Sequence, residues 1–261
     1  MNQPKSDTDN WFVCPQTNLG AEMRLFLFPY AGGGPAAFWK WSSELPSHIE
    51  TWIAHYPGRG SRYNKAPAKK MFGLVGGIFH AISSLLDKPF AFFGHSLGGL
   101  VAYELAQSLH KNNLQRPIAL FVSACSAPQL PDTNPPIHRL PDPEFVSALQ
   151  ELNGIPEEVA NQPELLELLL PTLRADFEIA ENYQYNPSEQ LLICPIVALG
   201  GIDDPRVSRE RLEGWTSQTS SSFTSIYFPG DHFYLNTAKG EIIESITREM
   251  KFSLSAKRKS G

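Results

Sequence analysis

Short apolar runs alternate along the chain with longer amphipathic segments. Most of the runs are nearly continuous, which is typical of strands covered on both faces of a parallel sheet. We expect strands at residues 24–28, 51–55, 90–93, 118–124, 195–200 and 223–228. Apolar residues at helical spacing predict helices at residues 71–86, 97–110, 208–218 and 237–250. This alternation predicts an α/β fold with a mostly parallel central sheet flanked by helices.

One long segment interrupts the alternation. From about residue 128 to residue 187 no strand-like run occurs. The segment opens with the proline-dense stretch PQLPDTNPPIHRLPDP and continues with two helical stretches rich in Leu and Glu. We therefore predict a helical insertion within the sheet. The expected parts are a first core segment at 1–127, the insertion at 128–187, a second core segment at 188–252 and a flexible tail at 253–261.

Composition narrows the classes of function. The chain has 261 residues, which suffice for one large core with a small insertion, and it carries a net charge of −5 without a long basic run. Phosphate binding needs clustered positive charge, so we expect no nucleic-acid partner. We also expect no signal peptide, no membrane span and a monomer. Cys14, Cys125 and Cys194 form no CxxC pair. Buried thiols in the cytoplasm, with no metal or cofactor, are therefore expected.

A serine flanked by glycines follows the third expected strand. Residues 94–98 read Gly-His-Ser-Leu-Gly and fit the pattern G-x-S-x-G between an expected strand and an expected helix. The residues two positions away must be small in such a sharp turn, which accounts for Gly94 and Gly98. The turn exposes the serine hydroxyl at the edge of the sheet. We predict Ser96 as a nucleophile, and the alternative is a glycine-rich turn with an incidental serine.

A serine hydroxyl needs a base, and the base needs an orienting acid. In this kind of fold their order along the chain is Ser, then Asp or Glu, then His. Three of the seven histidines, His110, His138 and His232, follow the serine. His110 ends the helix after the serine, and His138 lies in the proline-dense stretch. We predict His232, which lies just past the last expected strand in FPGDHFYL, as the base.

The stretch GGIDDPRV supplies two adjacent candidates for the acid. Asp204 fits a G-x-x-D-x-x-V pattern and is the predicted acid, with Asp203 as the alternative. Asp231 is adjacent to His232, and neighbours in an extended loop usually point apart, so it is not preferred.

Cleavage of an acyl group also needs N–H donors for the charge that develops on its carbonyl oxygen. The Leu97 amide is one expected donor, because it begins the helix after the serine. We assign the second to Ala31 in PYAGGG, since glycines let backbone amides approach closely. No G-K-[ST] follows these glycines, which argues against a phosphate-binding loop. Tyr30, Gly32 and Phe233 are expected to bind substrate.

Five stretches together resemble the type II thioesterases, which are stand-alone α/β-hydrolases that accompany polyketide synthases and nonribosomal peptide synthetases. They are FPYAGGGPAAFWKW, YPGRGSR, FGHSLGG, GGIDDPRV and FPGDHFYL, and the resemblance runs from about Arg24 to Glu249. It implies Ser96, Asp204 and His232 as a catalytic triad. It also implies Ala31 and Leu97 as oxyanion donors and the helical insertion as a mobile lid.

The resemblance implies hydrolysis, in trans, of acyl thioesters on the phosphopantetheine arm of an acyl or peptidyl carrier protein. Its role would be to edit stalled assembly lines. An acyl-CoA thioesterase or oxyester hydrolase of the same fold is the alternative, and a non-enzymatic binding module is a third possibility. Arg59 and Arg62 are candidates for contacting the phosphate or the acidic carrier, or for ordinary surface salt bridges. Some of the lid's apolar residues are expected either to line an acyl pocket or to pack in the core: Phe145, Leu149, Leu166, Leu169 and Leu170.

Overall fold

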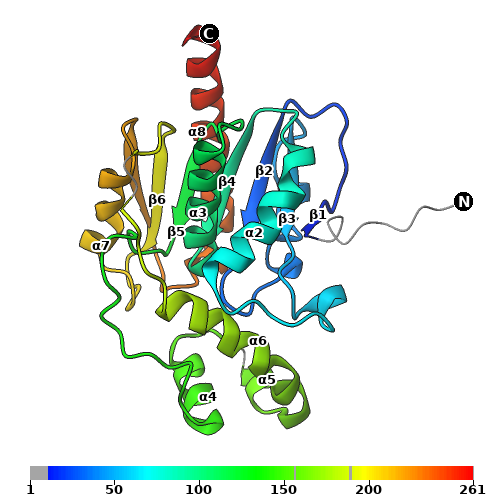
Figure 1. Ribbon diagram of the computed structural model, residues 1–261, viewed down its shortest axis with the longest axis vertical. Helices are drawn as coiled ribbons and strands as arrows, with labels where there is room; N and C mark the ends of the chain where they lie inside the picture. Colours follow the sequence, from blue (N-terminus) through cyan, green and yellow to red (C-terminus); the bar gives the residue numbers. More distant parts are fainter. Residues whose placement is uncertain (1–10, 156, 188–189, 261) are drawn as a thin grey trace, which may run out of the picture.

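The computed structural model describes residues 11–155, 157–187 and 190–260, and these residues form one sheet with helices on both faces and a helical insertion (Figure 1). The strands are β1 (Phe12–Val13), β2 (Met23–Phe28), β3 (Ile49–Ala54), β4 (Phe90–His95), β5 (Leu120–Ser123), β6 (Ile196–Gly201) and β7 (Phe223–Phe228). The helices are α1 (Trp41–Glu44), α2 (Met71–Ile82), α3 (Leu97–Lys111), α4 (Asp142–Glu151), α5 (Glu157–Ala160), α6 (Pro163–Glu181), α7 (Arg209–Glu213) and α8 (Lys239–Ser260).

The strands lie in the order β1-β3-β2-β4-β5-β6-β7. All neighbouring pairs are parallel except β1 with β3, where Phe12 pairs with Ala54. Every residue of β4, β5 and β6 is buried, because helices cover both faces of the sheet. The predicted α/β-hydrolase fold is confirmed. All six expected strands are present, and β1 is an additional antiparallel edge strand.

Two cores sandwich the sheet. On one face, α2 and α3 pack with Trp215, which follows α7, against strand residues such as Phe92. On the other face, α8 packs with Trp41 of α1 against residues such as Phe93. Figure 1 shows α2 and α3 in front of the strands and α8 behind them. Phe92 and Phe93 are adjacent in β4, and their side chains enter opposite cores because a strand alternates its faces.

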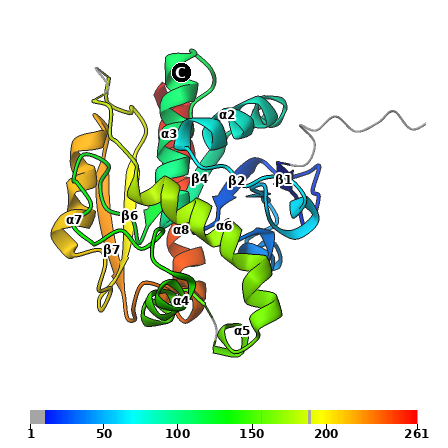
Figure 2. The ribbon, with the colours of Figure 1, turned by 60° about the horizontal axis from the view of Figure 1, so that its bottom comes forward.

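The segment between β5 and β6 contains α4, α5 and α6. Figure 2 shows α6 lying across the end of the sheet beside β2, with α4 and α5 beyond it. These helices have a small core of their own, built around Phe145, Leu149, Ile155 and Leu173. The insertion therefore covers the edge at which the parallel strands end.

The C-terminal segment differs from the expectation. Residues 253–261 were expected to form a flexible tail, but α8 continues to Ser260, because Ser253 and Leu254 are still buried against the sheet core. Gly261 and the first ten residues of the expected core segment 1–127 lie outside the described residues.

Candidate active site

Ser96 occupies the single residue between the end of β4 and the start of α3. Its backbone has φ 53° and ψ −120°, a conformation that costs a non-glycine residue on the order of 1–3 kcal/mol. A Cβ at Gly94 would overlap the backbone of Gly98, and one at Gly98 would overlap the carbonyl oxygen of Phe28. The backbone thus approaches itself and β2 too closely for any side chain. These contacts explain the spacing of the two glycines around the serine.

His232 and Asp204 are brought together by the loops after β7 and β6. His232 Nδ1 lies 2.9 Å from Asp204 Oδ2. The other carboxylate oxygen accepts the amides of Arg206 at 2.8 Å and Val207 at 3.2 Å, and the Asp204 side chain has no exposed surface. The carboxylate is therefore fixed by the turn that follows it.

The two other acids near the imidazole lie elsewhere. Asp203 is exposed. Asp231 accepts the side-chain amide of Asn153 at 2.7 Å and the backbone amide of Phe233 at 2.8 Å. Of the three acids considered from the sequence, the structure places Asp204 against the imidazole.

Ser96 and His232 line one cavity of about 550 Å³. Within the described residues the Ser96 hydroxyl makes no hydrogen bond, to the imidazole or to any other group. Since Nδ1 of His232 faces Asp204, Nε2 is the ring nitrogen that remains for the hydroxyl. Catalytic hydrogen bonds are often long in an unliganded site and shorten when substrate binds.

Both expected oxyanion amides lie beside the serine. Ala31 and Leu97 line the same cavity as Ser96, and Leu97 is the first residue of α3, where backbone N–H groups lack partners within the helix. In the described part of the chain, neither amide donates a hydrogen bond to another residue. The Gly32 amide, in contrast, donates to Asp176 Oδ2 at 2.7 Å. The Gly32 amide thus points towards α6. We had expected Gly32 to bind substrate.

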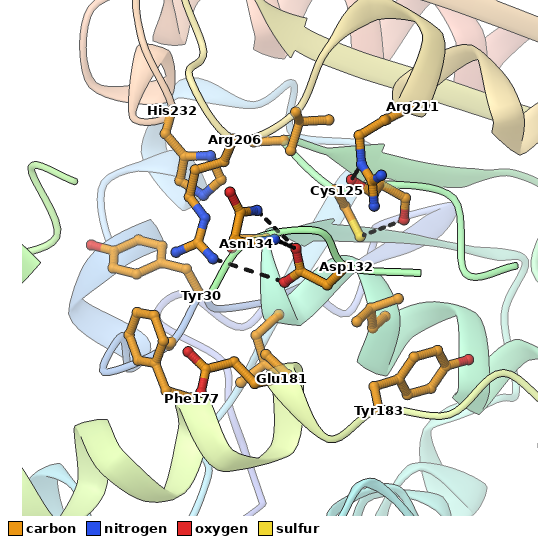
Figure 3. Close-up of a pocket in the computed structure, with 18 of the residues that line it drawn as sticks. Tyr30, Cys125, Asp132, Asn134, Phe177, Glu181, Tyr183, Arg206, Arg211 and His232 are labelled. Atoms are coloured by element: carbon orange, nitrogen blue, oxygen red, sulfur yellow. Dashed lines mark hydrogen bonds and ion pairs between the residues drawn. The ribbon is translucent and has the colours of Figure 1, made fainter. Parts of the chain in front are cut away.

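Tyr30 and Phe233 line the cavity, as expected for substrate-contacting residues. Their rings pack edge to face, 5.1 Å apart, and the Phe233 ring lies 5.4 Å from that of His232. Figure 3 shows Tyr30 close to His232, with Tyr183 at the opposite end of the cavity. The aromatic pair therefore forms one wall beside the imidazole.

Several cavity residues were not anticipated from the sequence. They come from the proline-dense stretch after β5, from the end of α6 and the residues just after it, from the turn after Asp204 and from α7. They are Asp132, Asn134, Phe177, Glu181, Tyr183, Arg206 and Arg211 (Figure 3). Arg206 Nη2 lies 4.0 Å from Asp132 Oδ2, so polar groups from opposite segments meet across the cavity. Nothing in local spacing signals this, because the contact depends on how the insertion folds back.

Among the apolar lid residues proposed from the sequence, Leu149 lines the cavity. Phe145 is fully buried in the small core of the insertion, and Leu166, Leu169 and Leu170 pack against that core. The packing alternative is therefore the one that the structure supports for these four residues.

Arg59 and Arg62 are both buried, so neither the phosphate-contacting nor the surface alternative fits them. Arg59 forms a two-pronged ion pair with Asp176, with distances of 2.6 and 2.8 Å. Arg62 donates to the carbonyl oxygen of His55 at 2.6 Å and lies over the ring of Trp11. Both guanidinium groups are occupied by protein partners.

Neither of the other two histidines that follow Ser96 in the sequence, His110 and His138, is placed to act as its base. His110 lies near the far end of α3, roughly 20 Å along the helix from Ser96 at 1.5 Å per residue. His138 pairs with Glu181 within the insertion.

His95, adjacent to the serine, is fully buried, and its Nδ1 lies 2.8 Å from the hydroxyl of Ser123, which is 2.6 Å from the hydroxyl of Tyr234. Burial holds the pKa of His95 well below its usual range, so this ring stays neutral.

The described residues include no group of three His, Cys, Asp or Glu side chains placed to hold a metal ion. No helix among them is long and apolar enough to cross a membrane. All three cysteines are free; Cys125 and Cys194 are buried as expected, while Cys14 is half-buried. Burial raises the pKa of the Cys125 thiol to about 12, so this cavity residue is a poor nucleophile.

The chain is similar in sequence to known thioesterases. The family model of the thioesterase domain matches residues 23–250. The gramicidin S biosynthesis protein GrsT of Aneurinibacillus migulanus is 40% identical over 252 residues, which cover 97% of this chain and 98% of that protein. The medium-chain S-acyl fatty acid synthase thioesterase of Homo sapiens is 32% identical, covering 90% of this chain and 89% of that protein.

A solved structure is also similar. The type II thioesterase BorB from the borrelidin biosynthetic cluster superimposes with a TM-score of 0.86 at 32% identity, covering 95% of this chain and all of that one. The match of a family model to most of the chain, together with these full-length similarities, settles the family. This chain belongs to the thioesterase family, whose members hydrolyse thioesters.

Proposed function

We propose that this thioesterase hydrolyses acyl groups held as thioesters on the phosphopantetheine arm of carrier proteins, acting in trans to clear stalled polyketide or nonribosomal peptide assembly lines. The similarity to proteins of gramicidin S and borrelidin biosynthesis supports this substrate class. The three free cysteines fit a reducing, cytoplasmic setting. An acyl or peptidyl carrier protein is the proposed partner.

The proposed chemistry begins with Ser96. His232 Nε2 takes the proton of the hydroxyl as the oxygen attacks the thioester carbonyl, and Asp204 holds the ring and stabilises the imidazolium that forms. The negative charge that develops on the carbonyl oxygen is met by the amides of Ala31 and Leu97. The carbon–sulfur bond then breaks, and the proton on His232 passes to the departing sulfur, so that the pantetheine leaves as a thiol and the imidazole is neutral again.

The second half of the reaction restores the enzyme. His232 removes a proton from water, the resulting hydroxide attacks the Ser96 ester, and the same amides meet the charge on oxygen. Collapse of this intermediate releases the carboxylic acid and returns the proton to Ser96. Because a thiolate is a good leaving group, little help from a general acid is needed in the first half.

One observation carries the proposal: the His232–Asp204 pair opens onto the same cavity as a serine held in a strained turn. Each of these features costs stability, since a buried carboxylate must be desolvated and the Ser96 backbone is strained. Acyl transfer requires a nucleophile, a base held by an acid, and free N–H donors at one cavity. Ser96, the His232–Asp204 pair and the amides of Ala31 and Leu97 supply these groups.

A substrate panel tests the proposal. Initial rates would be measured on an acyl-[carrier protein] by intact mass spectrometry, on the matching acyl-CoA, and on a p-nitrophenyl ester with the same acyl chain. We expect kcat/KM to be highest for the carrier protein. Equal or higher values for acyl-CoA would favour the acyl-CoA thioesterase alternative, and a preference for the ester would favour an oxyester hydrolase. Ser96→Ala is the control for contaminating hydrolases.

A further inference from the structure

The middle of helix α6 is tied to the two loops that follow β2 and β3. Thr172, Leu173 and Asp176 lie on one side of the helix and are buried, with Asp176 only 1% exposed. Thr172 Oγ1 donates to the carbonyl oxygen of Gly58 at 2.7 Å. The Leu173 side chain fills the space where Gly32 would otherwise carry a Cβ, and Gly32 has φ +76°. This turn of α6 therefore packs directly on the loop that carries Ala31.

Asp176 is the centre of this contact. Its Oδ2 accepts the Gly32 amide at 2.7 Å and Arg59 Nη1 at 2.6 Å, and its Oδ1 accepts Arg59 Nη2 at 2.8 Å. Arg59 Nη1 also donates to the carbonyl oxygen of Gly33 at 2.9 Å. The carboxylate and the guanidinium thus hold both an N–H and a C=O group of consecutive residues in one short loop.

Such a contact is strongly directional. A buried carboxylate is tolerated when charged and neutral donors satisfy its oxygens, and removing one partner leaves a costly uncompensated group. The bidentate Arg59–Asp176 pair fixes the plane of the carboxylate. The plane in turn fixes the direction of the Gly32 N–H, which points towards α6.

The orientation of Gly32 bears on its neighbour. Ala31 lines the cavity with Ser96, and its amide donates to no other described residue. Gly32, one residue on, is turned away from the cavity towards Asp176. The peptide plane that carries the Gly32 N–H and the plane that carries the Ala31 N–H meet at the Cα atom of Ala31, so a displacement of the loop that moves this atom also moves the Ala31 amide.

We propose that Asp176, together with Arg59, is a positioning residue for the oxyanion loop, so that the docked state of α6 and a correctly aimed Ala31 amide occur together. The inference rests on the proposed function in one respect, namely that Ala31 donates to the oxyanion. It divides the insertion into two parts: the Thr172–Asp176 turn belongs to the catalytic scaffold, and any opening of the lid leaves this turn in place.

Asp176→Asn tests the inference, with Asp142→Asn as a matched control. Asp142 also pairs with an arginine of the insertion, Arg174, whose other contacts in the described part of the chain are with the carbonyl oxygen of His138 and the ring of Phe145. In Asp176→Asn the NH₂ group takes the place either of Oδ1, which loses the bond from Arg59 Nη2, or of Oδ2, which loses the bonds from both Gly32 and Arg59 Nη1. In either orientation the two-pronged ion pair with Arg59 is lost. We expect kcat to fall about 10- to 100-fold with KM nearly unchanged, somewhat less than the roughly 10²–10³-fold cost of deleting an oxyanion donor. The control should stay within about twofold of the wild type.

Two further readouts separate positioning from a general structural role. Affinity for a trifluoromethyl ketone, which forms a tetrahedral oxyanion on the serine, should fall in parallel with kcat. Affinity for an unreactive amide analogue of the substrate should not change. An Asp176→Asn enzyme with wild-type kcat, or one in which KM rises and kcat is kept, would overturn the inference.

If Asp176→Asn does not fold, as judged by circular dichroism and thermal melting, Arg59→Lys provides the second test. It keeps the charge but loses the two-pronged geometry, and the same kcat loss is expected. Each assay is run on both an acyl-[carrier protein] and a p-nitrophenyl ester. If the wild-type enzyme hydrolyses the ester but not the acyl-[carrier protein], the proposed function is refuted. If the variant hydrolyses the ester with the wild-type kcat, the positioning role is refuted.

Discussion

The imidazole Nδ1 of His232 lies 2.9 Å from Oδ2 of Asp204, a carboxylate that is entirely shielded from solvent. The two residues are 28 positions apart and come from loops after two neighbouring parallel strands, β6 and β7. The contact fixes which ring nitrogen faces the acid and which is left for Ser96. It also separates Asp204 from the adjacent Asp203, which is exposed.

Asp204→Asn is expected to lower kcat by roughly 10³- to 10⁴-fold, because an amide can donate to Nδ1 and stabilise the wrong tautomer of His232. Asp203→Asn should leave kcat within about threefold of the wild type. Steady-state hydrolysis of one thioester by both purified variants checks this. The reverse ranking would move the acid to Asp203.

The strain at Ser96 predicts a difference between two inactive variants. Ser96→Ala keeps a Cβ at φ 53° and keeps the strain, whereas Ser96→Gly relieves it. With a strain of about 1–3 kcal/mol and a glycine entropy cost of about 0.5–1 kcal/mol, Ser96→Gly should be more stable than Ser96→Ala by about 1 kcal/mol. Urea unfolding of the two variants measures the difference. A more stable alanine variant would show that the turn is relaxed.

The glycines of the turn predict a contrast in stability. In Gly98→Ala the new methyl group would overlap backbone of β2, so we expect destabilisation on the order of 3 kcal/mol or more. Gly76 lies within α2, and a Cβ there would meet nothing within 4 Å. Gly76→Ala should therefore stabilise the protein by about 0.5–1 kcal/mol, the helix-propensity difference. Thermal melting of both variants measures the contrast. Similar changes in melting temperature for Gly98→Ala and Gly76→Ala would contradict the close approach at Gly98.

Burial of His95 predicts a loss of stability in mild acid. Its pKa is lowered in the folded state, so the unfolded chain binds a proton at higher pH than the native one does. Stability contributed by the neutral ring is complete above the unfolded pKa of about 6.5 and is lost as the pH falls from there towards the lower folded value. His95→Asn can keep a hydrogen bond to Ser123 without titrating. Its free energy of unfolding should fall less between pH 7 and pH 5 than that of the wild type, and an equal fall would show that other groups dominate.

The sequence was informative where chemistry and local geometry coincide. Short motifs were enough to predict the strand–turn–helix around Ser96 and the loop positions of Asp204 and His232. In each case the spacing of the motif is set by the geometry of a single turn. β1 was missed because a two-residue edge strand has no periodicity to read. The continuation of α8 was missed because the burial of Ser253 and Leu254 depends on the packed sheet core, which a polar C-terminal sequence does not reveal.

The contacts of the insertion could not be predicted in the same way. Arg59 and Asp176 are 117 residues apart, and an arginine in a Gly-Arg-Gly loop is ordinarily a surface residue. Only the folded position of α6 makes this pair a buried one. The polar lining from Asp132, Glu181 and Arg206 likewise depends on segments that meet through the insertion. Long-range polar contacts carry no local sequence period, so they become visible in the structure alone.

The most direct measurement follows the acyl group itself. The enzyme is mixed with an acyl-[carrier protein], quenched in acid within milliseconds to seconds, digested and mapped by mass spectrometry. The account predicts a transient acyl ester on the peptide that contains Ser96, formed at least as fast as turnover, and no ester and no hydrolysis in Ser96→Ala. Appearance of the acyl group on another residue, or undiminished hydrolysis by Ser96→Ala, would contradict it.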